Sequence, residues 1–204
     1  MSSVFQTYFE LGFRHIFNLQ AYDHIVFLLA LCAPYVLADW RRVVALVTSF
    51  TVVHSLTLAL ATLGMVQYSA VLIEALIPVT ILLTCLANLA KAGRAEARPA
   101  RRSRPEPLVL ALPNLLAATF GLIHGLGFSS YLRELLGRQS QPILELLAFN
   151  VGVELGQLFI VSLILVVGLV VLRVFGALRR DWLLVVSGAA AGIALVLLLD
   201  QPGK

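Results

Sequence analysis

The sequence predicts an all-α integral membrane protein, a bundle of six transmembrane helices with an N-terminal interfacial or half-inserted helix. Three observations predict this fold class. Of the 204 residues, 60% are hydrophobic and only 13% are charged. The mean hydropathy of +0.93 is too high for one water-soluble core to bury the apolar surface. Several apolar segments also reach the roughly 20 residues that a helix needs to cross a bilayer. We therefore expect residues 1–204 to form a single transmembrane domain.

The N-terminal segment, residues 4–19, is too short and too polar for a seventh span. Its aromatic residues recur every four positions, which places them along one helical stripe: Phe5, Phe9, Phe13 and Phe17. This pattern favours a helix that lies in the membrane interface or is half inserted. Glu10 and Arg14 interrupt any apolar core of a signal peptide, so we expect the first span to direct membrane targeting.

The six predicted spans and their connections define an orientation. The spans are residues 22–37, 43–64, 68–90, 108–128, 142–172 and 182–199. Of the 15 Lys and Arg residues, 11 fall in the odd-numbered connections, six of them in the basic loop 91–107. The positive-inside rule therefore predicts a multi-pass protein of the cytoplasmic (inner) membrane, with this loop in the cytoplasm and both termini outside. The loops explain the net charge of +4, so the lipid bilayer is the expected partner and nucleic acid is not.

All four histidines and three carboxylates lie in or beside the apolar segments. Ionisable groups at membrane depth are costly, and they usually face the interior of a bundle and mark a site or a pathway. Imidazole and carboxylate together suit divalent transition metals such as nickel, cobalt or zinc, as a substrate or as a bound ion. The sequence therefore predicts an intramembrane metal site built from His15, Asp23, His24, His54, Glu74, His124 and Glu154.

The first two spans carry the N-terminal part of this set. Asp23 and His24 lie at the outer mouth of the first span, where Asp23 could instead cap the helix. In the second span, Thr51, His54 and Ser55 share one helical face, with Thr51 and Ser55 as supporting polar groups. His54 is about the twelfth residue of its span and should lie near the midplane. The alternative is that His54 is a hydrogen-bonded packing residue.

The third and fourth spans each add one ionisable residue. Glu74 follows soon after an outer turn and precedes Pro78, which is expected to kink the helix. Its shallow position also fits a purely interfacial carboxylate. In the fourth span, Gly121 and Gly125 flank His124, so another backbone can approach closely beside this imidazole.

The fifth span places polar and small residues on adjacent faces. Asn150, Glu154 and Gln157 share one face, with Glu154 near the midplane and the two amides as supporting groups. Gly152 and Gly156 form a small-xxx-small contact surface beside them. A carboxylate at this depth needs a proton, a cation or a basic partner, and the spans contain no Lys or Arg to provide one.

A short internal sequence repeat, which we call the internal echo, links the second and fourth spans. Residues 50–56 and 120–126 share the frame Phe-x-x-[Val/Ile]-His-[Ser/Gly]-Leu. Each frame is followed by a span that carries a Glu. Because the two spans run in the same direction, the echo predicts a parallel repeat.

These motifs resemble those of the HupE/UreJ family of membrane proteins. The likeness is carried by His15 with Asp23-His24 and by three runs: FTVVHSLTL at 50–58, FGLIHGLGF at 120–128 and FNVGVELGQ at 149–157. His15 is separated from Asp23 by more residues than in the family's better-studied branch, which is typical of a divergent branch. Members are regarded as nickel or cobalt permeases tied to hydrogenase and urease maturation.

The resemblance implies secondary metal transport, with metalloenzyme-maturation proteins as candidate partners. By matching motif, it implies metal-handling roles for His15, Asp23, His24, His124 and Glu154. A divalent metal permease is thus the leading interpretation.

Two other functions use the same residues. Three histidines could hold a zinc-like ion with an open water position, while a carboxylate acts as base in an intramembrane metal-dependent hydrolase. His54 and His124 could also be axial ligands of a haem electron carrier, although that role leaves the carboxylates unused. The sequence favours transport and leaves the enzyme open.

Overall fold

The computed structural model describes residues 2–18, 22–94, 112–135 and 142–200. Within these ranges the chain is helical and contains no strand, which confirms the all-α fold class. The predicted loop 91–107 lies mostly outside them. The elements are α1 (Ser2–Ile16), α2 (Asp23–Cys32), the 3₁₀ turn η1 (Leu37–Asp39), α3 (Trp40–Thr62), α4 (Ala70–Arg94), α5 (Leu112–Gly127), α6 (Ser129–Leu135), α7 (Pro142–Arg173) and α8 (Arg179–Leu199).

In the described part of the chain, four helical segments are long and apolar enough to cross a membrane. Their mean hydropathies run from 2.0 to 2.8. They correspond to the second, third, fifth and sixth predicted spans: Leu37–Thr62, Ala70–Gly93, Ile143–Arg173 and Arg179–Leu199. The length and composition of these four helices therefore support a multi-pass membrane protein.

The first and fourth predicted spans are helices, but they are short. The 10 residues of α2 and the 16 residues of α5 rise about 15 Å and about 24 Å, less than the roughly 30 Å of a hydrocarbon core. Pro34 comes two residues after the last residue of α2, and because it has no backbone N–H it cannot continue the helical hydrogen bonds, which explains the early end. Residues 108–111 of the fourth span lie outside the described ranges. The count of six spans is not confirmed.

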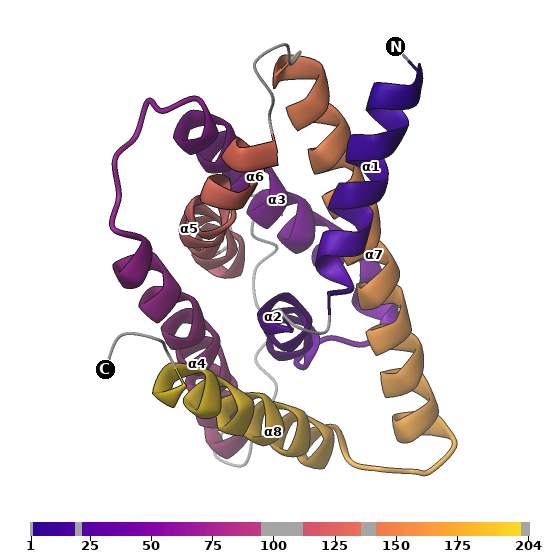
Figure 1. Cartoon of the computed structure of the whole chain (residues 1–204). Helices are drawn as coiled ribbons and strands as arrows, with labels where there is room; N and C mark the ends of the chain where they lie inside the picture. The colour runs from indigo at the N-terminus through magenta and orange to yellow at the C-terminus, as the bar shows by residue number, and fades with distance from the viewer. Residues whose placement is uncertain (1, 19–21, 95–111, 136–141, 201–204) are drawn as a thin grey trace.

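The short helix α2 lies in the middle of the bundle, between α4, α7 and α8 (Figure 1). Its apolar side chains, including Phe27, pack into a core that also contains Phe50 of α3. The buried Asn88 of α4 donates a hydrogen bond to the Ala30 carbonyl of α2 at 2.7 Å. Because other helices surround α2, its polar ends can be buried in protein rather than exposed to lipid.

The N-terminal helix α1 packs along α7 (Figure 1). A Cβ atom at Gly12 would collide with the backbone of Phe149, and one at Gly152 would collide with the backbone of Phe9. The absence of side chains at these glycines lets the two helices touch through their backbones. Helix α1 therefore packs on the small-xxx-small surface predicted on α7. This contact places α1 against a candidate span over its length.

The two helices of the internal echo, α3 and α5, pack against each other. A Cβ atom at Gly121 would meet the Phe50 carbonyl, and one at Gly125 would meet the His54 carbonyl. The contacts advance along both helices together, so α3 and α5 run in the same direction, as the repeat predicts. This close packing brings His54 and His124 into the same layer of the bundle.

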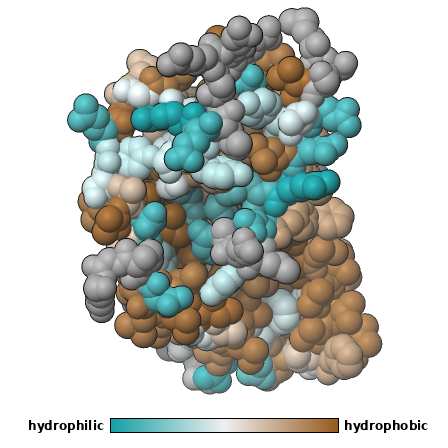
Figure 2. Space-filling model, viewed as in Figure 1, coloured by the Kyte–Doolittle hydropathy of each residue, from teal (hydrophilic) through white to brown (hydrophobic). Residues whose placement is uncertain are grey.

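The outer surface fits a lipid environment. Figure 2 shows a continuous hydrophobic surface over the region where Figure 1 places the lower half of α7 and α8. On α7 the exposed apolar side chains recur at helical spacing: Leu155, Phe159, Leu163, Val166 and Val170. Such a face would be unstable in water and is stable against acyl chains.

Candidate metal-binding site

The four histidines come together from four different helices. His15 lies at the end of α1, His24 in the first turn of α2, His54 within α3 and His124 near the end of α5. The ring centroids of His15 and His24 are 4.7 Å apart, and those of His24 and His124 are 5.4 Å apart. His54 interacts electrostatically with the other three imidazoles. We call these four residues with Asp23 the histidine cluster.

The imidazoles of His24, His54 and His124 are buried, that of His15 is partly buried, and all four are incompletely hydrogen-bonded. His54, His124 and His24 are 0%, 1% and 6% exposed, respectively. In the described residues, each of the four rings has at least one buried nitrogen without a hydrogen-bond partner: His15 Nε2, His24 Nε2, both nitrogens of His54, and His124 Nδ1. Buried polar atoms are rarely left unpaired, so several unpaired atoms in one place call for a functional explanation. A nitrogen lone pair that accepts no hydrogen bond is available to a cation.

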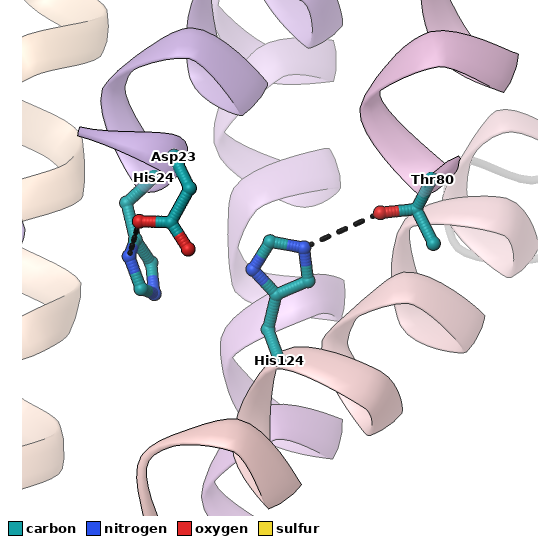
Figure 3. Close-up of polar contacts among 4 residues, drawn as sticks. All are labelled: Asp23, His24, Thr80 and His124. Atoms are coloured by element: carbon teal, nitrogen blue, oxygen red, sulfur yellow. Dashed lines mark hydrogen bonds and ion pairs between the residues drawn. The ribbon is translucent and has the colours of Figure 1, made fainter. Parts of the chain in front are cut away.

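Two rings of the cluster are held by polar neighbours (Figure 3). The Asp23 carboxylate lies 3.1 Å from His24 Nδ1. On the other side, Thr80 Oγ1 of α4 lies 3.4 Å from His124 Nε2. Asp23 therefore contacts its neighbouring imidazole rather than standing apart as a helix cap. Nothing in the sequence pattern distinguishes Thr80 from Thr84 on the same helix.

His15 is in the neutral form that a metal ligand requires. Burial lowers the pKa of His15 to about 3, and the nearby His24 acts in the same direction. The ring therefore carries no proton on one of its nitrogens at physiological pH. Metal binding at this residue does not have to displace a proton first.

Aromatic side chains form the walls of the cluster. Phe27 and Phe50 contact the His124 ring at centroid distances of 5.1 Å and 5.4 Å. Phe128 lies 3.8 Å from the His15 ring and stacks on Phe149. Such walls limit access of water and strengthen electrostatic interactions among the groups that they enclose.

The chain matches a protein-family model over nearly its whole length. The family model described as HupE / UreJ protein matches residues 1–200. The chain belongs to the HupE/UreJ family. No curated protein and no solved structure matches it. The resemblance seen in its sequence motifs is confirmed, and membership supports a role of the metal-transporter type.

In this HupE/UreJ protein, Glu154 and Glu74 are placed differently from the histidines. Glu154 accepts a hydrogen bond of 2.8 Å from Thr48 on the contact between α3 and α7. One turn further along α7, Gln157 accepts a bond of 2.7 Å from Thr51. Glu74 is exposed on α4. Asp23 is therefore the carboxylate that contacts an imidazole of the cluster, whereas Glu154 is hydrogen-bonded to Thr48.

The polar residues predicted to support the site in this HupE/UreJ protein also differ in their surroundings. Thr51 and Gln157 are buried and join α3 to α7. Ser55 is half-buried. Asn150 has a buried amide oxygen for which the described residues provide no hydrogen-bond partner. No sequence motif indicates Glu145, a carboxylate on α7 that is only 6% exposed and hydrogen-bonded to Tyr8 of α1.

The side chains of the HupE/UreJ protein do not form a closed metal cage. In residues 2–18, 22–94, 112–135 and 142–200, no three His, Cys, Asp or Glu side chains are arranged to hold one ion together. Within the cluster, the rings lie in neighbouring pairs, with centroids 4.7 Å apart for His15 and His24 and 5.4 Å apart for His24 and His124. This arrangement differs from a structural zinc site, in which four ligands enclose the metal.

Proposed function

We propose that this HupE/UreJ protein is a secondary transporter, a permease, for a divalent transition-metal ion, nickel or cobalt. The observation that supports it most directly is the convergence of four imidazoles from four helices, each with a buried nitrogen that has no hydrogen-bond partner among the described residues. Together with Asp23, they provide the nitrogen and oxygen donors that suit these ions. The family membership adds support from the whole chain.

The chemistry of the cluster favours passage over permanent binding. A conducting site must bind the ion well enough to admit it and weakly enough to release it. Thiolates would hold such ions more tightly, but Cys32 and Cys85 lie in the apolar cores of the bundle. Imidazoles that approach in pairs leave part of the coordination sphere to water. An ion bound in this way can be handed from one pair to the next.

The proposal includes a membrane orientation and a route. With both termini outside the cytoplasm of an inner-membrane protein, Asp23 and His24 meet the ion first, and His54 and His124 bind it deeper. The proposal keeps the six predicted spans, including the two that contain α2 and α5. Glu154 is a candidate for a later step, and Glu74 for an interfacial one. Metalloenzyme-maturation proteins would receive the ion in the cytoplasm.

Flux through reconstituted protein tests the proposal. Liposomes that contain the purified protein and an internal metal-sensitive dye should show uptake of cobalt or nickel. The variants His24→Ala and His124→Ala should lose this uptake. Thr119→Ala is a matched control, because Thr119 is an exposed residue on the same helix as His124. Uptake that persists in both histidine variants would refute the role of the cluster.

The same preparation tests the hydrolase alternative. A permease should lose its metal on dialysis against a chelator and regain flux when the metal returns. A metal-dependent hydrolase should retain a tightly bound, zinc-like ion through dialysis and show no flux. Retained metal without flux would therefore replace the transport proposal with the enzyme.

A further inference from the structure

We propose that Thr80 is a positioning residue that fixes the tautomer of His124, so that the Nδ1 lone pair of this ring is the one offered to the metal ion. The proposal rests on the proposed function for its purpose, but the tautomer is a property of the metal-free protein. Nothing in the motifs of the sequence singles out Thr80. It lies on α4, two residues after Pro78, and is only 3% exposed.

The Thr80 hydroxyl has two hydrogen-bond contacts, and the shorter one is to a carbonyl oxygen. Thr80 Oγ1 lies 2.7 Å from the carbonyl oxygen of Ile77. A carbonyl oxygen only accepts hydrogen bonds, so the single proton of the hydroxyl is donated to Ile77. The oxygen of Thr80 can then take part in a second hydrogen bond only as the acceptor.

The second hydrogen bond of Thr80 therefore assigns the proton on His124. His124 Nε2 lies 3.4 Å from Thr80 Oγ1, so this nitrogen must be the donor. A neutral imidazole carries one N–H group, which leaves its other nitrogen with a bare lone pair. The other nitrogen, Nδ1, is buried and has no hydrogen-bond partner in the part of the chain that the structure describes.

The bare nitrogen of His124 is turned toward the rest of the cluster. In Figure 3, the ring lies between Thr80 on one side and the pair of Asp23 and His24 on the other. Its Nε2 is directed toward Thr80, and Nδ1 is on the side of the pair. The lone pair is thus offered where the proposed ion would pass.

His24 is fixed by the same logic with the opposite nitrogen. Its Nδ1 lies 3.1 Å from the Asp23 carboxylate, which accepts the N–H and leaves Nε2 bare and buried. Two facing rings from α2 and α5 are thereby set in complementary tautomers by partners that need not bind the ion themselves. Hydrogen bonds of this kind orient metal-binding histidines and raise their basicity. Thr80 does for His124 what Asp23 does for His24.

The first test reads the tautomer directly in metal-free protein. Protein labelled with ¹⁵N-histidine is measured by NMR in lipid nanodiscs at neutral pH, and the His124 signals are assigned by their absence in His124→Gln. Wild type and Thr80→Ser, which keeps the hydroxyl, should show a protonated Nε2. Thr80→Val, which removes it, should shift His124 toward the Nδ1–H form. A wild-type ring protonated at Nδ1 would overturn the proposal.

The second test measures cobalt binding in the same variants. Thr80→Val should raise the cobalt dissociation constant about 10- to 100-fold, the usual cost of losing a partner that orients a ligand. Thr80→Ser should restore most of the affinity. Thr84→Val is the matched control, since the Thr84 hydroxyl donates to the Thr80 carbonyl within α4. Equal affinity of Thr80→Val and wild type would refute the positioning role.

The two tests separate this proposal from the proposed function. If the tautomer and the cobalt affinity depend on Thr80 while no variant or wild type moves metal across liposomes, the positioning role stands and the transport proposal fails. If wild type moves metal and Thr80→Val leaves both tautomer and affinity unchanged, transport stands and the role of Thr80 fails. The thermal unfolding of Thr80→Ser and Thr80→Val should be compared to show that both variants are folded.

Discussion

Neutralising Asp23 gives a quantitative test of the histidine cluster. In Asp23→Asn the side chain keeps its size but loses the charge that lies 3.1 Å from His24 Nδ1. At an effective dielectric constant of about 20, two full unit charges at that separation would interact by about 5 kcal/mol. The actual loss should be smaller, because a metal-bound ring carries part of a charge and the Asp23 side chain is 18% exposed to screening.

A loss of about 1.4 to 2.7 kcal/mol is therefore expected, equivalent to a 10- to 100-fold weaker affinity for cobalt. Titration of the purified protein with cobalt, followed by its visible absorption, gives the dissociation constant. Asp39→Asn removes the same charge from a residue that pairs with Arg42 at 3.8 Å, outside the cluster, and serves as the control. An unchanged affinity in Asp23→Asn would refute the argument.

Two further predictions concern stability. Gly121→Ala should lower the free energy of unfolding by about 1 to 3 kcal/mol, because the new Cβ meets the backbone of α3. Gly188→Ala is the control, since no atom of the described residues lies within 4 Å of a Cβ placed there. Equal unfolding temperatures of the two variants would contradict the close packing. As the pH falls from 6.5 toward the lowered His15 pKa of about 3, the unfolded chain gains a proton that the folded ring excludes, so stability should fall. Thermal unfolding of His15→Gln should show a weaker pH dependence, and an unchanged slope would argue against a buried neutral His15.

The predictable part of the fold follows from local patterns. The frame around His54 and His124 predicts two parallel helices, and the glycines on α5 predict the close approach that the structure contains. The Gly152–Gly156 surface likewise predicts a tight neighbour on α7. The sequence does not tell which helix that neighbour is, because small residues accept any backbone of suitable shape. That it is α1 depends on the packing of the whole bundle.

The candidate site, like the fold, can be predicted from local patterns only in part. Burial of ionisable groups in apolar segments is enough to select the four histidines. Helical spacing also places Glu154 and Gln157 on one face, but only the packing of α7 on α3 decides that this face meets Thr48 and Thr51. Thr80 escapes prediction because a threonine in a helix most often bonds to its own backbone. Thr80 does so too, and its second contact exists only in three dimensions.

A helix of 10 residues cannot set its own depth in a bilayer. The level at which α2 carries Asp23 and His24 is inherited from the surrounding helices, through contacts such as the one between Asn88 and the Ala30 carbonyl. A tilt or shift of α4 would therefore raise or lower one half of the proposed coordination sphere relative to the other. In this bundle, a substitution far from every imidazole can still change the distances between the groups that bind the ion.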